Sequence, residues 1–327
     1  MGLNKIGQFF TPDYIAKFMV RNAKSYYFKS HLSQNLKDVK VLEPSVGQGV
    51  FLDVLKEEGF IDIISYELDI TLKKQLLDRF PNINIHFENF LGSDIEDKFD
   101  IIVGNPPYLG QNYNAEIFQD LVNRFPICKK YFVGNMDLFY FFIHLGILKL
   151  NMGGYLTYIT TNYWISKSDK TGIKYLKPHI IQDCYLVQFI DLSNLHLFKD
   201  ALGQHNCIFI LRKKTDEEKN KGIDFPIEII QIAKKKDLKI SDNVYNQLVF
   251  EQILTETSSP LFKKYVSALT NSDLFLMDNW HLLYPREIND IILHIEDACK
   301  KERKTQVLGD YFSIRNGLIL IKDEIFI

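Results

Sequence analysis

The residues of this chain best suited to chemistry stand together at positions 101–108, Ile-Ile-Val-Gly-Asn-Pro-Pro-Tyr. The β-branched apolar run at 101–103 predicts a short, buried, parallel strand. Asn105 follows where that strand ends, and open α/β sheets bind their ligands at the carboxyl ends of the strands. Two prolines fix the backbone and supply no N–H donor, so the loop is rigid and rich in acceptors.

This loop suits a planar group that carries an NH2. The side-chain oxygen of Asn105 and the carbonyl of Pro106 are acceptors that can point at one donor, and Tyr108 adds a flat aromatic face. These three residues are therefore the candidates for catalysis. The alternative is that Asn-Pro only forms a turn that ends the strand.

A second candidate site is the glycine-rich stretch Glu-Pro-Ser-Val-Gly-Gln-Gly, which starts at Glu43. It follows a short apolar run at 39–42 and precedes a helical pattern. A strand, a glycine-rich turn and a helix are typical of a nucleotide-binding α/β unit, because Gly47 and Gly49 let a ligand approach the backbone. No Lys-Ser/Thr pair follows the second glycine, so the stretch is not a P-loop.

The next predicted strand, 61–68, places Glu67 at its tip, about twenty residues beyond the glycines. An acid at this position can accept hydrogen bonds from ribose hydroxyls; the alternative is a solvated loop carboxylate. Near the start of the chain, Thr11 is expected to be a helix N-cap, with Pro12 at the first helical position. The alternative is that this helix N-terminus holds a ligand's carboxylate.

The alternation of strands and helices predicts an α/β fold with a doubly wound, mostly parallel sheet and helices on both faces. A buried helix is expected over 135–152, ended by Gly153 and Gly154. Seven strands are expected in all, at residues 39–42, 61–68, 82–88, 101–103, 155–161, 185–192 and 206–212.

Composition narrows the class of protein. The chain has 327 residues and a formal net charge of −2, so any nucleic-acid site must depend on local basic patches. Its four cysteines form no CxxC pair, which favours a reducing cytoplasm and argues against a zinc site or a disulfide framework. The longest apolar run, 138–148, is too short to cross a bilayer. We expect a cytoplasmic protein with no metal and no membrane role.

A change in composition suggests two domains. Residues 1–222 are expected to form the catalytic domain, because a polar, mixed-charge run at 213–222 follows the last predicted strand. Residues 223–327 are expected to form an extension and the start of a β-rich module. That module is expected to be cut short.

The ordered series of motifs resembles the gamma-class N6-adenine DNA methyltransferases, the TaqI-like enzymes of restriction–modification systems. The resemblance covers residues 7–212 and lies in the order of the motifs more than in any one of them. Its parts are Gly-Gln-Phe-Phe-Thr-Pro at 7–12 (motif X), 41–52 (motif I), Ser-Tyr-Glu-Leu-Asp at 65–69 (motif II), Glu-Asn-Phe at 88–90 (motif III) and 105–108 (motif IV).

The resemblance implies S-adenosylmethionine as the cofactor, bound across the carboxyl edge of a Rossmann-like methyltransferase sheet. The turn after strand one would hold its methionine part, Glu67 its ribose, and Phe90 would flank its adenine. Phe198 and Tyr108 would stack on the target base. The implied cofactor residues are Thr11, Glu43, Pro44, Ser45, Gly47, Gly49, Glu67, Leu68, Asn89, Phe90, Asn105 and Pro106.

One residue departs from the family pattern, which usually has Asp where this chain has Asn89. An Asn carbonyl can accept the hydrogen bond from the cofactor's adenine amine, but without the charge that strengthens such bonds. We therefore expect Asn89→Asp to tighten cofactor binding.

The resemblance implies site-specific methylation of the N6 amine of a flipped-out adenine in double-stranded DNA. It also implies a restriction endonuclease or a specificity subunit as a partner. Two alternatives stay open: a methyltransferase of an RNA base or a protein glutamine amide, and a catalytically silent DNA-binding subunit. The end of the chain is similar to the opening of a target-recognition domain, and the recognised DNA sequence cannot be read from it.

Overall fold

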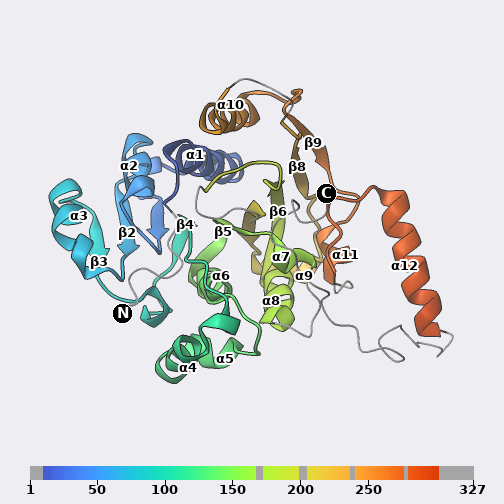
Figure 1. The fold of residues 1–327 in the computed structure, drawn as a ribbon, viewed down its shortest axis with the longest axis horizontal. Helices are drawn as coiled ribbons and strands as arrows, with labels where there is room; N and C mark the ends of the chain where they lie inside the picture. Colours follow the sequence, from blue (N-terminus) through green and yellow to red (C-terminus); the bar gives the residue numbers. More distant parts are fainter. Residues whose placement is uncertain (1–9, 167–171, 199–204, 236–239, 276–278, 302–327) are drawn as a thin grey trace, which may run out of the picture. The chain divides into compact units, whose positions relative to one another are not determined.

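A computed structural model describes residues 10–166, 172–198, 205–235, 240–275 and 279–301. The chain forms two compact units, residues 1–283 and 284–327. The second unit contains helix α12 (Arg286–Lys301), and the first contains all of the β-sheet described below (Figure 1).

One sheet organises the first unit. Its strand order is β3-β2-β1-β4-β5-β7-β6-β8-β9. Pairing is parallel from β3 to β5 and between β6 and β8, and antiparallel at β5–β7, β6–β7 and β8–β9. The strands are β1 (Lys40–Glu43), β2 (Asp62–Tyr66), β3 (Asn84–His86), β4 (Phe99–Gly104), β5 (Leu150–Thr161), β6 (Cys184–Asp191), β7 (Asn206–Lys213), β8 (Glu228–Ile232) and β9 (Phe262–Val266).

The prediction of a doubly wound, mostly parallel sheet is confirmed, but the expected number of seven strands is wrong: the sheet has nine. The two further strands, β8 and β9, come from the part of the chain beyond residue 222. The apolar side chains of β8, Ile229, Ile230 and Ile232, are buried on both faces of the sheet, which explains why this strand joins the sheet rather than a separate module. The assignment of residues 223–327 to a recognition module stays a prediction.

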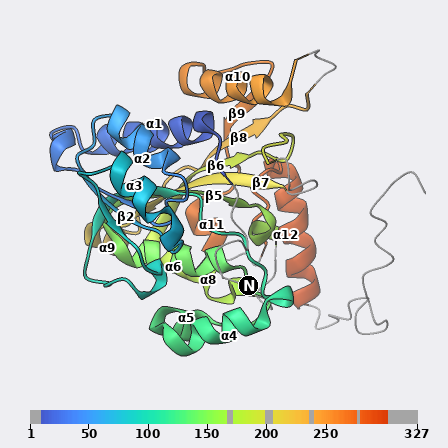
Figure 2. The ribbon, with the colours of Figure 1, turned by 60° about the vertical axis from the view of Figure 1, so that its left-hand side comes forward.

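Helices cover both faces of the sheet (Figures 1 and 2). Helices α1, α2 and α10 pack in one hydrophobic cluster, and α4, α5, α6 and α8 pack in the other. The helices of the first unit are α1 (Asp13–Ser30), α2 (Val50–Glu57), α3 (Lys73–Arg79), α4 (Ala115–Arg124), α5 (Pro126–Tyr131), α6 (Leu138–Lys149), α7 (Tyr163–Ser166), α8 (Leu176–Asp183), α9 (Asp216–Lys221), α10 (Asp242–Thr255) and α11 (Asn271–Phe275). Short 3-10 turns are η2 (Leu36–Asp38), η3 (Ile70–Leu72), η4 (Phe90–Gly92), η5 (Gln111–Tyr113) and η6 (Gly172–Lys174).

Strand β4 shows why the sheet has two apolar faces. Successive side chains of a strand point to opposite faces. Ile101 and Val103 therefore enter the cluster with α1 and α2, whereas Ile102 enters the cluster with α6. All three are buried, as a continuous apolar run predicts for a central parallel strand.

The helix expected over 135–152 is shorter than predicted. Helix α6 ends at Lys149, and β5 begins at Leu150, so Gly153 and Gly154 lie within a strand rather than after a helix. A Cβ at Gly154 would lie 3.0 Å from the carbonyl oxygen of Asp100. The glycine therefore allows β4 and β5 to approach closely where their register shifts.

The strand order shows at which edge of the sheet a ligand is expected to bind. Strand β1 lies between β2 on one side and β4 on the other, so the direction of winding reverses between β1 and β4. Ligands of open α/β sheets bind outside the carboxyl ends of the strands at this point. The turn after β1 and the loop after β4 leave the sheet there.

Candidate active site

The turn after β1, residues 44–49, is here named the glycine turn. Gly47 and Gly49 both have positive φ angles, 54° and 86°. Gly49 is the N-cap of α2, and a Cβ there would lie 2.5 Å from the ring of Phe80. A side chain at 49 would thus be strained and would clash, whereas a Cβ at Gly47 would meet nothing within 4 Å.

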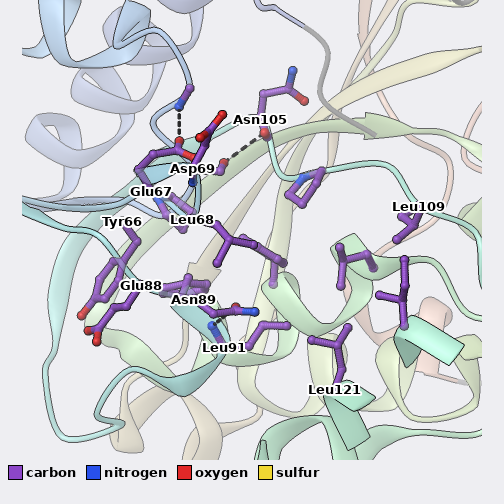
Figure 3. A pocket seen from close by; sticks show the side chains of 18 of the residues that line it. Tyr66, Glu67, Leu68, Asp69, Glu88, Asn89, Leu91, Asn105, Leu109 and Leu121 are labelled. Carbon is purple, nitrogen blue, oxygen red and sulfur yellow. Dashed lines mark hydrogen bonds between the residues drawn. The ribbon is translucent and has the colours of Figure 1, made fainter. Parts of the chain in front are cut away.

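Glu67 fastens this turn to the end of β2. Its Oε2 accepts a hydrogen bond from the backbone N–H of Gly47 at 2.7 Å, and its Oε1 accepts one from Asp69 N–H at 2.7 Å (Figure 3). The side chain is 4% exposed. Burial raises the pKa of Glu67, and the two backbone donors oppose that rise. Each carboxylate oxygen has a second lone pair for a further donor.

Glu43 lies beneath the glycine turn. Its Oε1 accepts a hydrogen bond from Ser45 N–H at 3.0 Å, and the Ser45 hydroxyl donates to the Asn105 carbonyl oxygen at 3.0 Å. Oε2 is buried and has no hydrogen-bond partner among the described residues. Burial raises the pKa of Glu43 well above its usual value. Burial thus disfavours the charged form of this carboxyl group, and a cation or a donor close to Oε2 would favour it.

The loop after β4, residues 105–108, is here named the Asn-Pro-Pro-Tyr loop. The Asn105 amide nitrogen donates to the Thr11 hydroxyl at 3.0 Å, which joins segments 94 positions apart in the sequence. The prediction that Thr11 caps the first helix is wrong. Helix α1 begins at Asp13, Pro12 is its N-cap, and no side chain caps it. The Thr11 hydroxyl instead orients the amide of Asn105.

Tyr108 is held inside the protein. It is 8% exposed, and its hydroxyl donates to the carbonyl oxygen of Ile159 at 3.0 Å. Burial raises its pKa well above the usual value, so the hydroxyl stays protonated. Phe198 lies edge-on to it, with ring centroids 6.4 Å apart and an interplanar angle of 75°. The structure therefore brings together the two aromatic residues that sequence reasoning assigned to the target base.

The glycine turn and the Asn-Pro-Pro-Tyr loop line one pocket (Figure 3). Eight of the residues predicted to bind a cofactor line it: Pro44, Ser45, Gly47, Glu67, Leu68, Asn89, Phe90 and Asn105. The others are placed around it: Glu43 and Gly49 support the turn, Thr11 contacts Asn105, and Pro106 is buried in the loop while Pro107 lines the pocket.

Sequence reasoning missed the apolar end of this pocket. Ile117 and Leu121 of α4 line it, as do Leu138 and Phe142 of α6. Each pair is spaced four residues apart, and residues with that spacing share one face of a helix. This spacing was the available signal. It marks which faces of α4 and α6 turn toward the site.

Asn89 and Phe90 line the pocket between the glycine turn and the apolar residues of α4 and α6. The Asn89 side-chain oxygen accepts a hydrogen bond from Leu91 N–H at 3.0 Å and so caps η4. Phe90 is buried between Tyr66 and Phe142, with ring centroids 5.4 Å and 5.2 Å away. The pocket is thus polar along the ends of β1 and β2 and apolar where Phe90, α4 and α6 line it.

Two further properties concern the described part of the chain. No helix in it is long and apolar enough to cross a membrane. No three His, Cys, Asp or Glu side chains of the described ranges gather where they could hold a metal ion.

Comparison with known proteins agrees with this architecture. The fold is that of the class I S-adenosylmethionine-dependent methyltransferases. A solved candidate methyltransferase of this class from Listeria monocytogenes aligns with a TM-score of 0.53 and 19% identity, over 77% of this chain and 72% of that one. The methyltransferase subunit of a type I restriction–modification system from Streptococcus thermophilus aligns with a TM-score of 0.56 and 14% identity, over 84% and 58%.

The sequence identifies the family. Residues 18–198 match the model of the Eco57I restriction-modification methylase, and the chain belongs to that family. It is 27% identical over 332 residues to the type II methyltransferase M.HindII of Haemophilus influenzae. That alignment covers 98% of this chain and 55% of M.HindII, so the chain spans about half the length of this relative.

Proposed function

We propose that this chain is the catalytic part of a restriction–modification DNA methyltransferase, which transfers a methyl group from S-adenosylmethionine to the N6 amine of adenine in double-stranded DNA. One observation carries the proposal: the glycine turn and the Asn-Pro-Pro-Tyr loop line a single pocket at the edge of the sheet where the direction of winding reverses between β1 and β4. Membership of the Eco57I family and the similarity to M.HindII support it.

The lining of the pocket fits S-adenosylmethionine. Glu67 would accept hydrogen bonds from the ribose, and the apolar floor at Phe90 would carry the adenine ring. The unpartnered oxygen of Glu43 would attract the ammonium of the methionine part. When bound, the cofactor supplies an electrophilic methyl group on a sulfonium sulfur.

The Asn-Pro-Pro-Tyr loop would act on the adenine. The N6 amine is a poor nucleophile because its lone pair is delocalised into the ring. The Asn105 side-chain oxygen and the Pro106 carbonyl would each accept a hydrogen bond from one of the two N–H groups of this amine, which turns its lone pair toward the methyl group. The N6–carbon bond would form as the sulfur–carbon bond breaks, and the extra proton on N6 would pass to solvent. Positioning and electrostatics would supply most of the rate enhancement.

The target adenine must leave the duplex to reach this loop. Tyr108 and Phe198 would hold the flipped base by ring contacts, which contribute about 1–3 kcal/mol per stacked base. Whatever selects the DNA sequence, including a specificity subunit or a partner endonuclease, would act outside these residues.

The test is transfer of a labelled methyl group from S-adenosylmethionine to unmethylated duplex DNA, followed by digestion and separation of the nucleosides. The proposal predicts label in N6-methyladenine, and at least about 100-fold less label with Asn105→Ala. Label in cytosine, or label only in RNA or protein substrates offered in parallel, would contradict it.

A further inference from the structure

The amide of Asn89 has a defined orientation. Its oxygen accepts the hydrogen bond from Leu91 N–H at 3.0 Å. Only the oxygen of an Asn side chain can accept from an N–H group, so the amide nitrogen must lie on the opposite side. Asn89 therefore uses its acceptor to cap η4.

The amide nitrogen is turned toward the pocket. Asn89 is partly exposed and lines the cavity, and Figure 3 shows its nitrogen on the side away from Leu91. Among the described residues, none accepts a hydrogen bond from this nitrogen. A ligand in the pocket therefore meets an N–H donor at position 89.

The position of a nucleoside base follows from the surrounding residues. Glu67 at the end of β2 is where an α/β unit binds ribose hydroxyls. Next to it, toward β3, the lining becomes apolar at Leu68, Phe90 and Phe142, which suits the faces of a flat purine. The Asn89 amide is the polar group at that end. The Glu88 carboxylate also lines the pocket but points away from Asn89, beside Tyr66 (Figure 3).

We propose that Asn89 donates a hydrogen bond to the purine of the bound nucleoside, so that the pocket accepts hypoxanthine nearly as well as adenine. This rests on the proposed use of a nucleoside cofactor. An amide N–H can bond a ring nitrogen of adenine or the 6-oxo group of hypoxanthine. A carboxylate at the same position would instead accept from the 6-amino group and would repel a 6-oxo group.

Three proteins test this: the wild type, Asn89→Asp and Asn89→Ser. Titration calorimetry would compare the binding of S-adenosylhomocysteine and of its hypoxanthine counterpart, S-inosylhomocysteine. Both substitutions keep a side-chain oxygen that can cap η4, so the local fold is preserved. Only the aspartate adds a charged acceptor that faces the base.

In the wild type we expect the two affinities to differ by less than about tenfold, because each purine offers an acceptor to the Asn89 N–H donor. Asn89→Asp is expected to raise the preference for the adenine compound by at least about tenfold. Asn89→Ser is expected to weaken the binding of both compounds without raising the preference for the adenine compound.

A wild-type preference for adenine above about a hundredfold would overturn the inference, since that preference requires an acceptor at the 6-amino group. So would an unchanged ratio in Asn89→Asp. If the wild type bound neither compound, the proposed function itself would fail, and this inference with it.

Discussion

Two buried carboxylates at the ends of neighbouring strands, Glu43 and Glu67, are partnered differently. Both are almost fully buried, and burial raises the pKa of each. Both oxygens of Glu67 accept backbone N–H groups, whereas Glu43 has one oxygen with no partner among the described residues. Glu67 is therefore part of the framework, and Glu43 has a hydrogen-bonding capacity that the described residues do not use.

The same contrast separates the two loops of the pocket. The glycine turn is held by its own backbone N–H groups, which donate to the carboxylates of Glu43 and Glu67 and to the Tyr66 carbonyl. The Asn-Pro-Pro-Tyr loop is instead held by side chains, through Thr11, the Ser45 hydroxyl and the Tyr108 hydroxyl. A cofactor site can be built from a fixed backbone, whereas the catalytic loop depends on a few removable contacts. Substitutions in the two loops should therefore differ in their effects on methyl transfer, cofactor binding and stability.

The largest effect is expected in the catalytic loop, from Asn105→Ala. Methyl transfer should fall by about 100- to 1000-fold or more, because a group that stabilises the transition state is removed. Cofactor affinity, measured by calorimetry, should change little. Asn123→Ala, at an exposed position of α4, is the matched control. Near-normal turnover in Asn105→Ala would refute the assigned role.

Two substitutions of Tyr108 distinguish the contribution of its ring from that of its hydroxyl. Tyr108→Ala should abolish methyl transfer and cost about 3–5 kcal/mol of stability, because it empties a buried aromatic site. Tyr108→Phe keeps the ring and removes the hydroxyl that donates to the Ile159 carbonyl, so it should cost about 1 kcal/mol in denaturant unfolding and keep most activity. Equal loss of transfer in both variants would assign a catalytic part to the hydroxyl.

The two glycines of the turn should also respond differently. Gly49→Ala combines a strained φ with a clash against Phe80 and should lower the free energy of unfolding by about 1–3 kcal/mol or more. Gly47→Ala meets no atom within 4 Å and should cost about 1 kcal/mol, yet weaken cofactor binding because its Cβ lies at the pocket. Equal stabilities would contradict the packing at Gly49.

The smallest effect concerns Glu43 and pH. Because the pKa of Glu43 is higher in the folded state, its stabilising contribution is present below the unfolded pKa and is lost as pH rises toward the folded value. Glu43→Gln should therefore gain stability over the wild type as pH rises, and it should bind the cofactor more weakly. Unfolding curves at pH 5 and pH 8 measure this. A pH-independent difference would contradict it.

The part of the fold that follows local patterns was predictable. The glycine-rich stretch after an apolar run predicted the turn between β1 and α2, and the Asn-Pro-Pro-Tyr loop follows β4 as expected. Glycines at 153 and 154 were interpreted as a helix end because their role, a close approach of β4 and β5, depends on a partner strand. Strands β8 and β9 were missed because they lie beyond the polar run that resembled a domain boundary.

The site was predictable where a motif defines it and not where packing does. Thr11 looked like a helix cap because capping is local, whereas its contact with Asn105 joins distant segments. Likewise, the faces of α4 and α6 that line the pocket are fixed only when those helices pack on the sheet. The roles of all these residues in binding and catalysis stay predictions.

The central claim is that one pocket holds the cofactor beside the Asn-Pro-Pro-Tyr loop. A crystal structure with S-adenosylhomocysteine tests it most directly. We expect the ribose hydroxyls within hydrogen-bond distance of Glu67, the adenine against Phe90 and the sulfur facing the loop at Asn105. A ligand bound elsewhere, or one whose sulfur points away from this loop, would show that the pocket does not serve methyl transfer.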